Sequence, residues 1–198
     1  MSGEQRSLFD GESLDGWFAT GVPGPWDVAD DCILLAEPGN GSFLCTEEYF
    51  DNFEFTFEYN HEPGCNSGVY FRWSELTDRA TGMEIQILDT HDRDDVPPKA
   101  ECGALYDLAA PENVETRPAG EWNQMCIRCD GPRIRAELNG ATTIDVDIDA
   151  WDTPGANPDG TENKFTNHAM GELPRRGRLG LQDHGGRIRF RNLQLREL

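Results

Sequence analysis

A short stretch of the sequence, GMEIQILDTH at residues 82–91, carries side chains that can perform acid–base chemistry. Its apolar residues alternate with Glu84 and Gln86, and Asp89 follows one position out of phase. A carboxyl group can give or take a proton, and an amide can bond a hydroxyl group. Along a strand Glu84 and Gln86 point to one face, whereas positions 84 and 89 diverge unless a bulge intervenes. The spacing predicts one polar surface, with Asp89 as a second acid or a ligand.

A second strand-like stretch, SGVYFRW at residues 67–73, supplies an aromatic ring and a guanidinium group. Alternation places Tyr70 and Arg72 on one face and Trp73 on the other. Such polar side chains suit a sugar when aromatic rings lie nearby, because rings pack on its C–H surface. The alternative is a solvated sheet face with ordinary cross-strand ion pairs.

The sequence LQDHGG at residues 181–186 places a histidine beside two glycines. A neutral imidazole suits proton abstraction near pH 7, so His184 is the candidate general base. Gln182 shares its face, whereas Asp183 points away and is not expected to orient the ring. The alternative is that His184 is only a turn residue.

The elements that must position these groups are strands. FEFTFEY at residues 53–59 alternates strictly, and similar text recurs to the end of the chain between short turns such as those at 130–132 and 139–140. This period predicts an all-β fold, a sandwich of two antiparallel sheets. Two long segments lack alternation, 90–121 and 149–176, and both are expected to wall a site.

Length and charge limit the classes of function. The 198 residues suit one large all-β domain covering 1–198. The formal net charge of −20 argues against nucleic-acid binding and against anionic membranes. No apolar run reaches the length of a membrane span, and no signal peptide is visible, so the sequence predicts a cytoplasmic protein. Its oligomeric state stays open.

The six cysteines are irregularly spaced, and they are expected to be buried free thiols. Cys126 and Cys129 have the spacing of a zinc pair, but positions i and i+3 of a strand face opposite ways, and no second pair exists.

Nine ordered segments resemble the 3-keto-disaccharide hydrolase domain family, a former domain of unknown function in the concanavalin A-like lectin/glucanase superfamily. They include LFDGESLDGW (8–17), NSGVYFR (66–72), GMEIQILD (82–89), GEWNQM (120–125) and GRLGLQDHGGRIRFRNLQLREL (177–198). The resemblance implies a concanavalin A-like jelly roll. Cys32 departs from the glycine usual in the family, and 149–176 has no counterpart that we can match.

The resemblance also implies an activity, cleavage of the glycosidic bond of sugars already oxidised to a ketone at C3. That ketone acidifies the C2 proton. Removing the proton gives an enolate, which can expel the group on C1 before water adds. The route needs one base, one group that holds the enolate oxygen, and one acid for the leaving oxygen. A non-catalytic carbohydrate-binding module is the alternative, because the same sandwich serves lectins.

Within this chemistry, His184 is the candidate base, Arg72 would hold the enolate or ketone oxygen, and Glu84 would be the acid or a substrate clamp. Residues expected to contact the sugar are Asn66, Tyr70, Gln86, Tyr106, Trp122, Asn123 and Gln182. The cofactor stays open. A divalent metal ion would stabilise an enediolate, and hard ligands are offered by Glu84, Asp89, His91 and His184, but no spacing requires one.

Glu84, Gln86 and Asp89 also resemble the E-x-D-x-x-E strand of laminarinase-type glucanases, whose two glutamates act as nucleophile and acid/base. Here an amide replaces the middle carboxylate and the last acid is shorter. A carboxyl separation of about 5 Å, which a retaining mechanism needs, is therefore not expected. We interpret the likeness as a shared location with different chemistry.

Overall fold

The computed structural model describes residues 3–21, 25–39, 41–76 and 78–198. Within these ranges the chain forms strands and four short 3₁₀ turns, with no α-helix. None of the helical turns in the described part is long or apolar enough to cross a membrane. The strands are β1 (Arg6–Ser7), β2 (Trp17–Ala19), β3 (Trp26–Ala29), β4 (Cys32–Leu35), β5 (Phe43–Thr46), β6 (Phe53–His61), β7 (Asn66–Trp73), β8 (Met83–Leu88), β9 (Asn123–Asp130), β10 (Arg133–Leu138), β11 (Ala141–Asp147), β12 (Arg178–Gln182) and β13 (Ile188–Glu197). The 3₁₀ turns are η1 (Arg79–Thr81), η2 (Pro98–Ala100), η3 (Ile148–Ala150) and η4 (Met170–Glu172).

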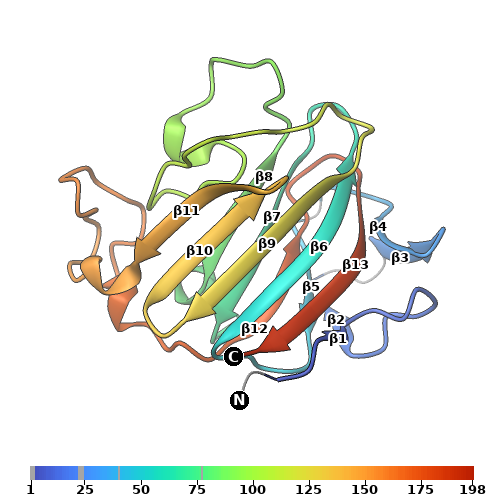
Figure 1. Ribbon diagram of the computed structural model, residues 1–198, viewed down its shortest axis with the longest axis horizontal. Coiled ribbons are helices and arrows are strands. Elements are labelled where there is room, and N and C mark those ends of the chain that lie inside the picture. The colour runs from blue at the N-terminus through green and yellow to red at the C-terminus, as the bar shows by residue number, and fades with distance from the viewer. Residues whose placement is uncertain (1–2, 22–24, 40, 77) are drawn as a thin grey trace.

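These strands make two antiparallel sheets that stack face to face (Figure 1). The eight-stranded sheet has the order β11-β10-β9-β6-β13-β4-β3, with β1 paired to β13. The five-stranded sheet has the order β2-β5-β12-β7-β8. The prediction of an all-β sandwich of two antiparallel sheets is confirmed.

Alternation along β6 explains how the eight-stranded sheet covers the core. Phe53, Phe55, Phe57 and Tyr59 are buried, whereas the residues between them are half-buried on the outer face. Burying an aromatic side chain of this size stabilises the folded chain by about 2–3 kcal/mol, so this one strand contributes strongly to the core.

In contrast, β7 and β8 are buried on both faces, which strict alternation did not predict. Their outer face carries a small aromatic cluster of Phe43, Tyr70 and Trp73, whose rings meet at centroid distances of 4.8–5.0 Å. The free edge of β8 is also covered. Gln86 N donates to the Ala104 carbonyl at 3.0 Å, and Tyr106 N donates to the Glu84 carbonyl at 2.9 Å.

A bulge in β7 changes the faces of its last residues. Tyr70 pairs with Gly180 and Trp73 pairs with Arg178. Between these two pairs β7 has two residues and β12 has one, so β7 contains one extra residue. Arg72 lies in this bulge, and its φ is +51°. Trp73 therefore joins Tyr70 on the outer face. The predicted pairing of Tyr70 with Arg72 on one face was wrong, because a simple period of two cannot foresee a bulge.

Candidate active site

A cavity of about 360 Å³ lies over the outer face of the five-stranded sheet. Strands β7, β8 and β12 form its floor, and the two long segments at 90–121 and 149–176 supply its walls. The lining residues are Tyr70, Asp78, Arg79, Ala80, Glu84, Gln86, Tyr106, Lys164, Phe165, Gln182 and His184. Mixed aromatic and polar walls of this size suit a small sugar.

Glu84 reaches into this cavity from β8 because its neighbour on β7 has no side chain. Gly68 pairs with Gln86, two positions along the ladder from the pair of Tyr70 and Glu84 and therefore on the same face. A Cβ atom placed on Gly68 would lie only 2.1 Å from Glu84 Oε1. The carboxyl group thus occupies space that any other residue at 68 would fill.

The Glu84 carboxyl group is held in an environment that favours its neutral form. The side chain is almost completely buried, and burial raises its pKa to about 7. The positive charge of Lys164, hydrogen bonds from Tyr70 and Gln182, and the charge of Arg79 act in the opposite direction. A carboxyl group with this pKa can exchange a proton with a substrate near neutral pH.

Two buried amides flank the carboxyl group. The Gln86 nitrogen can donate to the Ser67 carbonyl at 3.1 Å and to Glu84 Oε1 at 3.2 Å, which turns the amide oxygen toward Asn66. Gln182 bonds Glu84, yet its buried Oε1 has no hydrogen-bond partner among the described residues. A buried acceptor without a partner is costly, so a hydrogen bond to this oxygen would be favourable.

Tyr70 and Tyr106 border the carboxyl group on two sides. Burial raises the pKa of Tyr70, and the adjacent Glu84 carboxylate raises it further, so its phenol remains a hydrogen-bond donor. Burial also raises the pKa of Tyr106, whose ring carries the Lys164 ammonium group at 3.9 Å from its centroid. Both tyrosines were predicted to contact the sugar, and both line the cavity.

His184 follows β12 and lines the same cavity as Glu84, although its side chain is largely exposed. The chain places it there because β12 pairs with β7, the strand next to β8. The cavity therefore contains an imidazole at its rim and a carboxyl group at its floor, as the sequence predicted for these two residues.

The structure adds five lining residues that the sequence did not predict, namely Arg79, Ala80, Lys164, Phe165 and Asp78. The last of these holds the 3₁₀ turn η1 by accepting from Ala80 N at 2.9 Å, which positions Arg79. A signal for Lys164 existed, because the chain has only two lysines, and this one lies in the segment 149–176 that was expected to wall a site.

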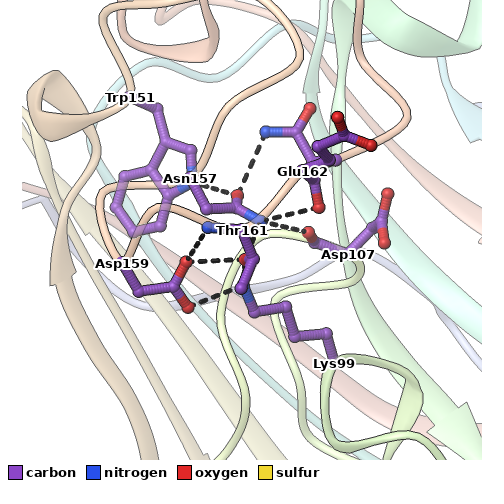
Figure 2. A network of polar contacts seen from close by, with 8 residues as sticks. Lys99, Asp107, Trp151, Asn157, Asp159, Thr161 and Glu162 are labelled. Carbon is purple, nitrogen blue, oxygen red and sulfur yellow. Dashed lines mark hydrogen bonds and ion pairs between the residues drawn. The ribbon is translucent and has the colours of Figure 1, made fainter.

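The segment 149–176 is ordered by a network centred on the buried side chain of Asn157 (Figure 2). Its Oδ1 accepts from Trp151 Nε1 at 2.8 Å and from Asn163 Nδ2 at 3.0 Å. Its Nδ2 donates to the Asp107 carbonyl at 3.3 Å, which ties this segment to the other long segment.

Arg72 lies outside the cavity. Its guanidinium group is buried and donates to the Asp51 carbonyl at 3.2 and 3.3 Å and to Asn52 Oδ1 at 3.4 Å. Burial lowers its pKa, and the nearby Cys129 and Asp51 oppose that shift. The predicted role of Arg72 at the substrate oxygen does not fit this position, because the bulge directs it away from Tyr70.

Asp89 also lies elsewhere, since its Oδ2 accepts from Gly64 N at 2.7 Å and stabilises a turn. Trp122 packs under Arg191, whose guanidinium carbon is 3.8 Å from the ring centroid. Asn123 is fully buried and bonds Arg117 N and Asn139 Nδ2. The predicted site role of these three residues does not fit these positions, because the turn and strand contacts that hold them lie outside the cavity. Asn66 is not among the residues that line the cavity, although it lies next to Gln86.

The four candidate metal ligands are likewise dispersed. Glu84 and His184 line the cavity, whereas Asp89 bonds Gly64 and His91 Nδ1 lies 3.0 Å from the Thr116 carbonyl. Within the described ranges, no three histidine, cysteine, aspartate or glutamate side chains are grouped as metal ligands. The residues in the cavity therefore do not fit a protein-bound metal centre of the kind considered from sequence.

A larger hollow of about 470 Å³ lies over the outer face of the eight-stranded sheet. Its charges form ion pairs, one across strands between Arg128 and Glu54 at 3.2 Å and one along β10 between Arg135 and Glu137 at 2.8 Å. The positive and negative side chains compensate one another at the surface, as they do on an ordinary solvated sheet face. The cavity around Glu84 is the stronger candidate for a chemical site.

Comparison with known proteins shows what the whole chain is similar to. A candidate glycosyl hydrolase of Parabacteroides distasonis has a crystal structure that matches with a TM-score of 0.87 and 30% identity, over 98% of this chain and 100% of that chain. Carbohydrate binding module CBM66 from Bacillus subtilis shares the fold, with a TM-score of 0.57 and 17% identity over 90% of this chain and 94% of the module.

A 3-keto-disaccharide hydrolase of Bacteroides thetaiotaomicron is 26% identical over an alignment 228 positions long, which covers 97% of this chain and 78% of that protein. These relatives support a glycosidase-like function and a carbohydrate ligand. The sequence profile of a family described as "3-keto-alpha-glucoside-1,2-lyase-like domain" matches residues 4–196, which is nearly the whole chain. This chain is therefore a member of the 3-keto-alpha-glucoside-1,2-lyase-like family.

Proposed function

We propose that this protein cleaves the glycosidic bond of 3-keto-glycosides by elimination followed by hydration. The observation that carries the proposal is the buried Glu84 carboxyl group, whose pKa burial raises to about 7, in a sugar-sized cavity. The 3-keto substrate class comes from the family and from the Bacteroides relative, a 3-keto-disaccharide hydrolase.

The first step is removal of the C2 proton by His184, which lines the cavity. The C–H bonding electrons form the C2–C3 double bond of an enolate, and the carbonyl electrons move to the C3 oxygen. A neutral imidazole at the cavity rim is a suitable base for this transfer.

In the second step the enolate regenerates the ketone and forms a C1–C2 double bond, which breaks the bond to the leaving oxygen. Protonated Glu84 donates its proton to that oxygen. Water then adds to C1 and a proton returns to C2, so the net change is hydrolysis. This route needs one carboxylic acid, which is consistent with the position of Asp89 outside the cavity.

Substrate binding is assigned to the two flanking amides and the two tyrosines. The unpartnered Oε1 of Gln182 would accept from a sugar hydroxyl, and Tyr106 would pack against the ring. A carbohydrate-binding module would need these contacts but has no use for an acid that remains protonated near neutral pH.

The test is incubation with 3-keto-trehalose in D₂O, followed by NMR of the released glucose and of C2. We expect cleavage with deuterium at C2 in the wild type, and loss of at least about 100-fold in kcat for Glu84→Gln and His184→Ala with sugar affinity retained. His91→Ala and Glu121→Gln, both outside the cavity, are the matched controls. Sugar binding without turnover in the wild type would instead identify a binding module.

A further inference from the structure

The ammonium group of Lys164 enters the cavity without an anionic partner at bonding distance. In the described part of the chain, Nζ makes no hydrogen bond and no ion pair. It contacts aromatic faces instead, at 3.9 Å from the Tyr106 ring centroid and 5.2 Å from the Phe165 centroid. All three of its N–H donors therefore remain available to a ligand.

This position is fixed by the backbone on both sides of the residue. Lys164 N donates to Asp107 Oδ2 at 2.6 Å, and Phe165 N donates to Asn163 Oδ1 at 3.0 Å. Asn163 in turn donates to Asn157, the centre of the network in Figure 2. The segment thus holds Lys164 over the cavity before any substrate arrives.

The other cation of the cavity is already engaged. Arg79 donates to the Gly41 carbonyl at 2.9 Å, and its guanidinium carbon lies 4.8 Å from the Phe43 ring centroid. Arg72, the cation predicted from sequence, lies outside the cavity. Lys164 differs from both arginines because, among the described residues, its side chain has no hydrogen-bond acceptor.

Charge within the cavity also favours this role. Lys164 acts on Glu84 electrostatically and is the largest influence opposing the burial of that carboxyl group. When Glu84 is protonated, its carboxyl group no longer offsets the ammonium charge of Lys164. An ammonium group with no acceptor at bonding distance can stabilise a substrate that becomes negative during reaction.

We propose that Lys164 binds the C3 oxygen of the substrate and stabilises the negative charge that this oxygen gains when the C2 proton leaves. The inference rests on the proposed function and extends it. The electron pair of the C2–H bond moves into the C2–C3 bond, and the carbonyl pair moves to oxygen beside the ammonium group. Lys164 keeps its own proton, and the pair returns to the carbonyl when the C1 bond breaks.

The experiment isolates this step with 3-keto-1,5-anhydroglucitol, a sugar that has no leaving group at C1. Exchange of its C2 proton in D₂O, followed by ¹H NMR, reports enolate formation alone. Lys164→Met should slow this exchange by about 100-fold or more, the usual effect of removing one oxyanion donor, with a much smaller change in affinity. Lys164→Arg should restore part of the rate.

Arg176→Met is the matched control, because Arg176 also packs over an aromatic ring, at 5.3 Å from the Tyr49 centroid, but outside the cavity. A second readout is independent of turnover. Since Lys164 lowers the pKa of Glu84, Lys164→Met should raise the midpoint of the Glu84 carboxyl titration, measured by ¹³C NMR.

The outcomes separate the two proposals. Exchange within about threefold of wild type in Lys164→Met, or an unchanged Glu84 midpoint, overturns the role of Lys164 even if the wild type cleaves 3-keto-trehalose. Wild-type exchange without cleavage overturns the proposed function and leaves the role of Lys164 in forming the enolate intact. No exchange in the wild type overturns both.

Discussion

Replacing Glu84 by glutamine should stabilise the protein at alkaline pH while it removes the activity. The carboxyl group is held among Tyr70, Gln182 and Lys164 in a buried cavity, where burial raises its pKa from an ordinary 4.5 to about 7. Ionising it inside the fold is therefore harder than ionising it in the unfolded chain. Glutamine has nearly the same shape and no charge to desolvate.

The direction of the pH dependence follows from proton binding. Below about pH 4.5 both states carry the proton, and Glu84 costs nothing. Between pH 4.5 and 7 the native state holds a proton that the unfolded state has lost, so the free energy of unfolding falls as pH rises. Above pH 7 Glu84 is ionised in both the native and the unfolded state, and the full free-energy cost of burying its charge lowers the stability.

The magnitude follows from the same two values. One pKa unit corresponds to about 1.4 kcal/mol, so the rise from 4.5 to about 7 costs the wild type about 3 kcal/mol at pH 8.5. Glu84→Gln escapes that cost. We expect its advantage in the free energy of unfolding to grow by about 3 kcal/mol between pH 4.5 and pH 8.5.

The assay is urea unfolding of wild type and Glu84→Gln at both pH values, with Glu121→Gln, an exposed carboxyl group, as control. Other titrating groups cancel in the difference between variants. An advantage that is the same at both pH values would refute the reasoning. In parallel, wild-type kcat should fall above about pH 7, where the acid loses its proton.

Three further predictions concern positioning. Gly68→Ala should fold normally but lose about 100-fold in kcat, because its Cβ displaces the Glu84 carboxyl; normal kinetics in a folded variant would contradict this. Asn157→Ala should lower the free energy of unfolding, measured with urea, by roughly 2–4 kcal/mol. It should also reduce the steady-state rate, because the network of Asn157 positions Lys164. Unchanged stability and rate would contradict the role of Asn157 as the centre of that network. Arg72→Met should leave kcat/KM within about twofold, since its guanidinium lies outside the cavity, and a large kinetic loss would restore the role predicted from sequence.

Strand alternation was sufficient to predict the fold and half of the cavity. Glu84, Gln86, Gln182 and His184 lie where simple face arguments placed them, because β8 and the end of β12 are regular. Arg72 was misplaced because the bulge in β7 adds one residue, and nothing in its local sequence specifies that bulge.

The remaining lining residues could not be predicted from local pattern. Lys164 depends on contacts between two irregular segments, made by Asn157 and Asp107, that are far apart in sequence. Asp89 shows the opposite failure. Its spacing from Glu84 suggested paired acids, but its side chain satisfies the backbone of a turn at Gly64. Residue types in the sequence indicate which chemistry is possible, whereas long-range packing determines which side chains lie in the same cavity.

The backbone pairing of Ala104 and Tyr106 with β8 also bears on how the protein stays dispersed. An uncovered edge strand offers amide and carbonyl groups to other molecules. The β8 sequence MEIQIL, with four apolar residues out of six, could then pair with strands of other copies and aggregate. The segment 90–121 covers the outer edge of β8 through these backbone hydrogen bonds. A proteolytic cut within it would free Tyr106 from the cavity and expose the edge of β8 at the same time, so that damaged molecules would both lose part of the cavity wall and begin to self-associate.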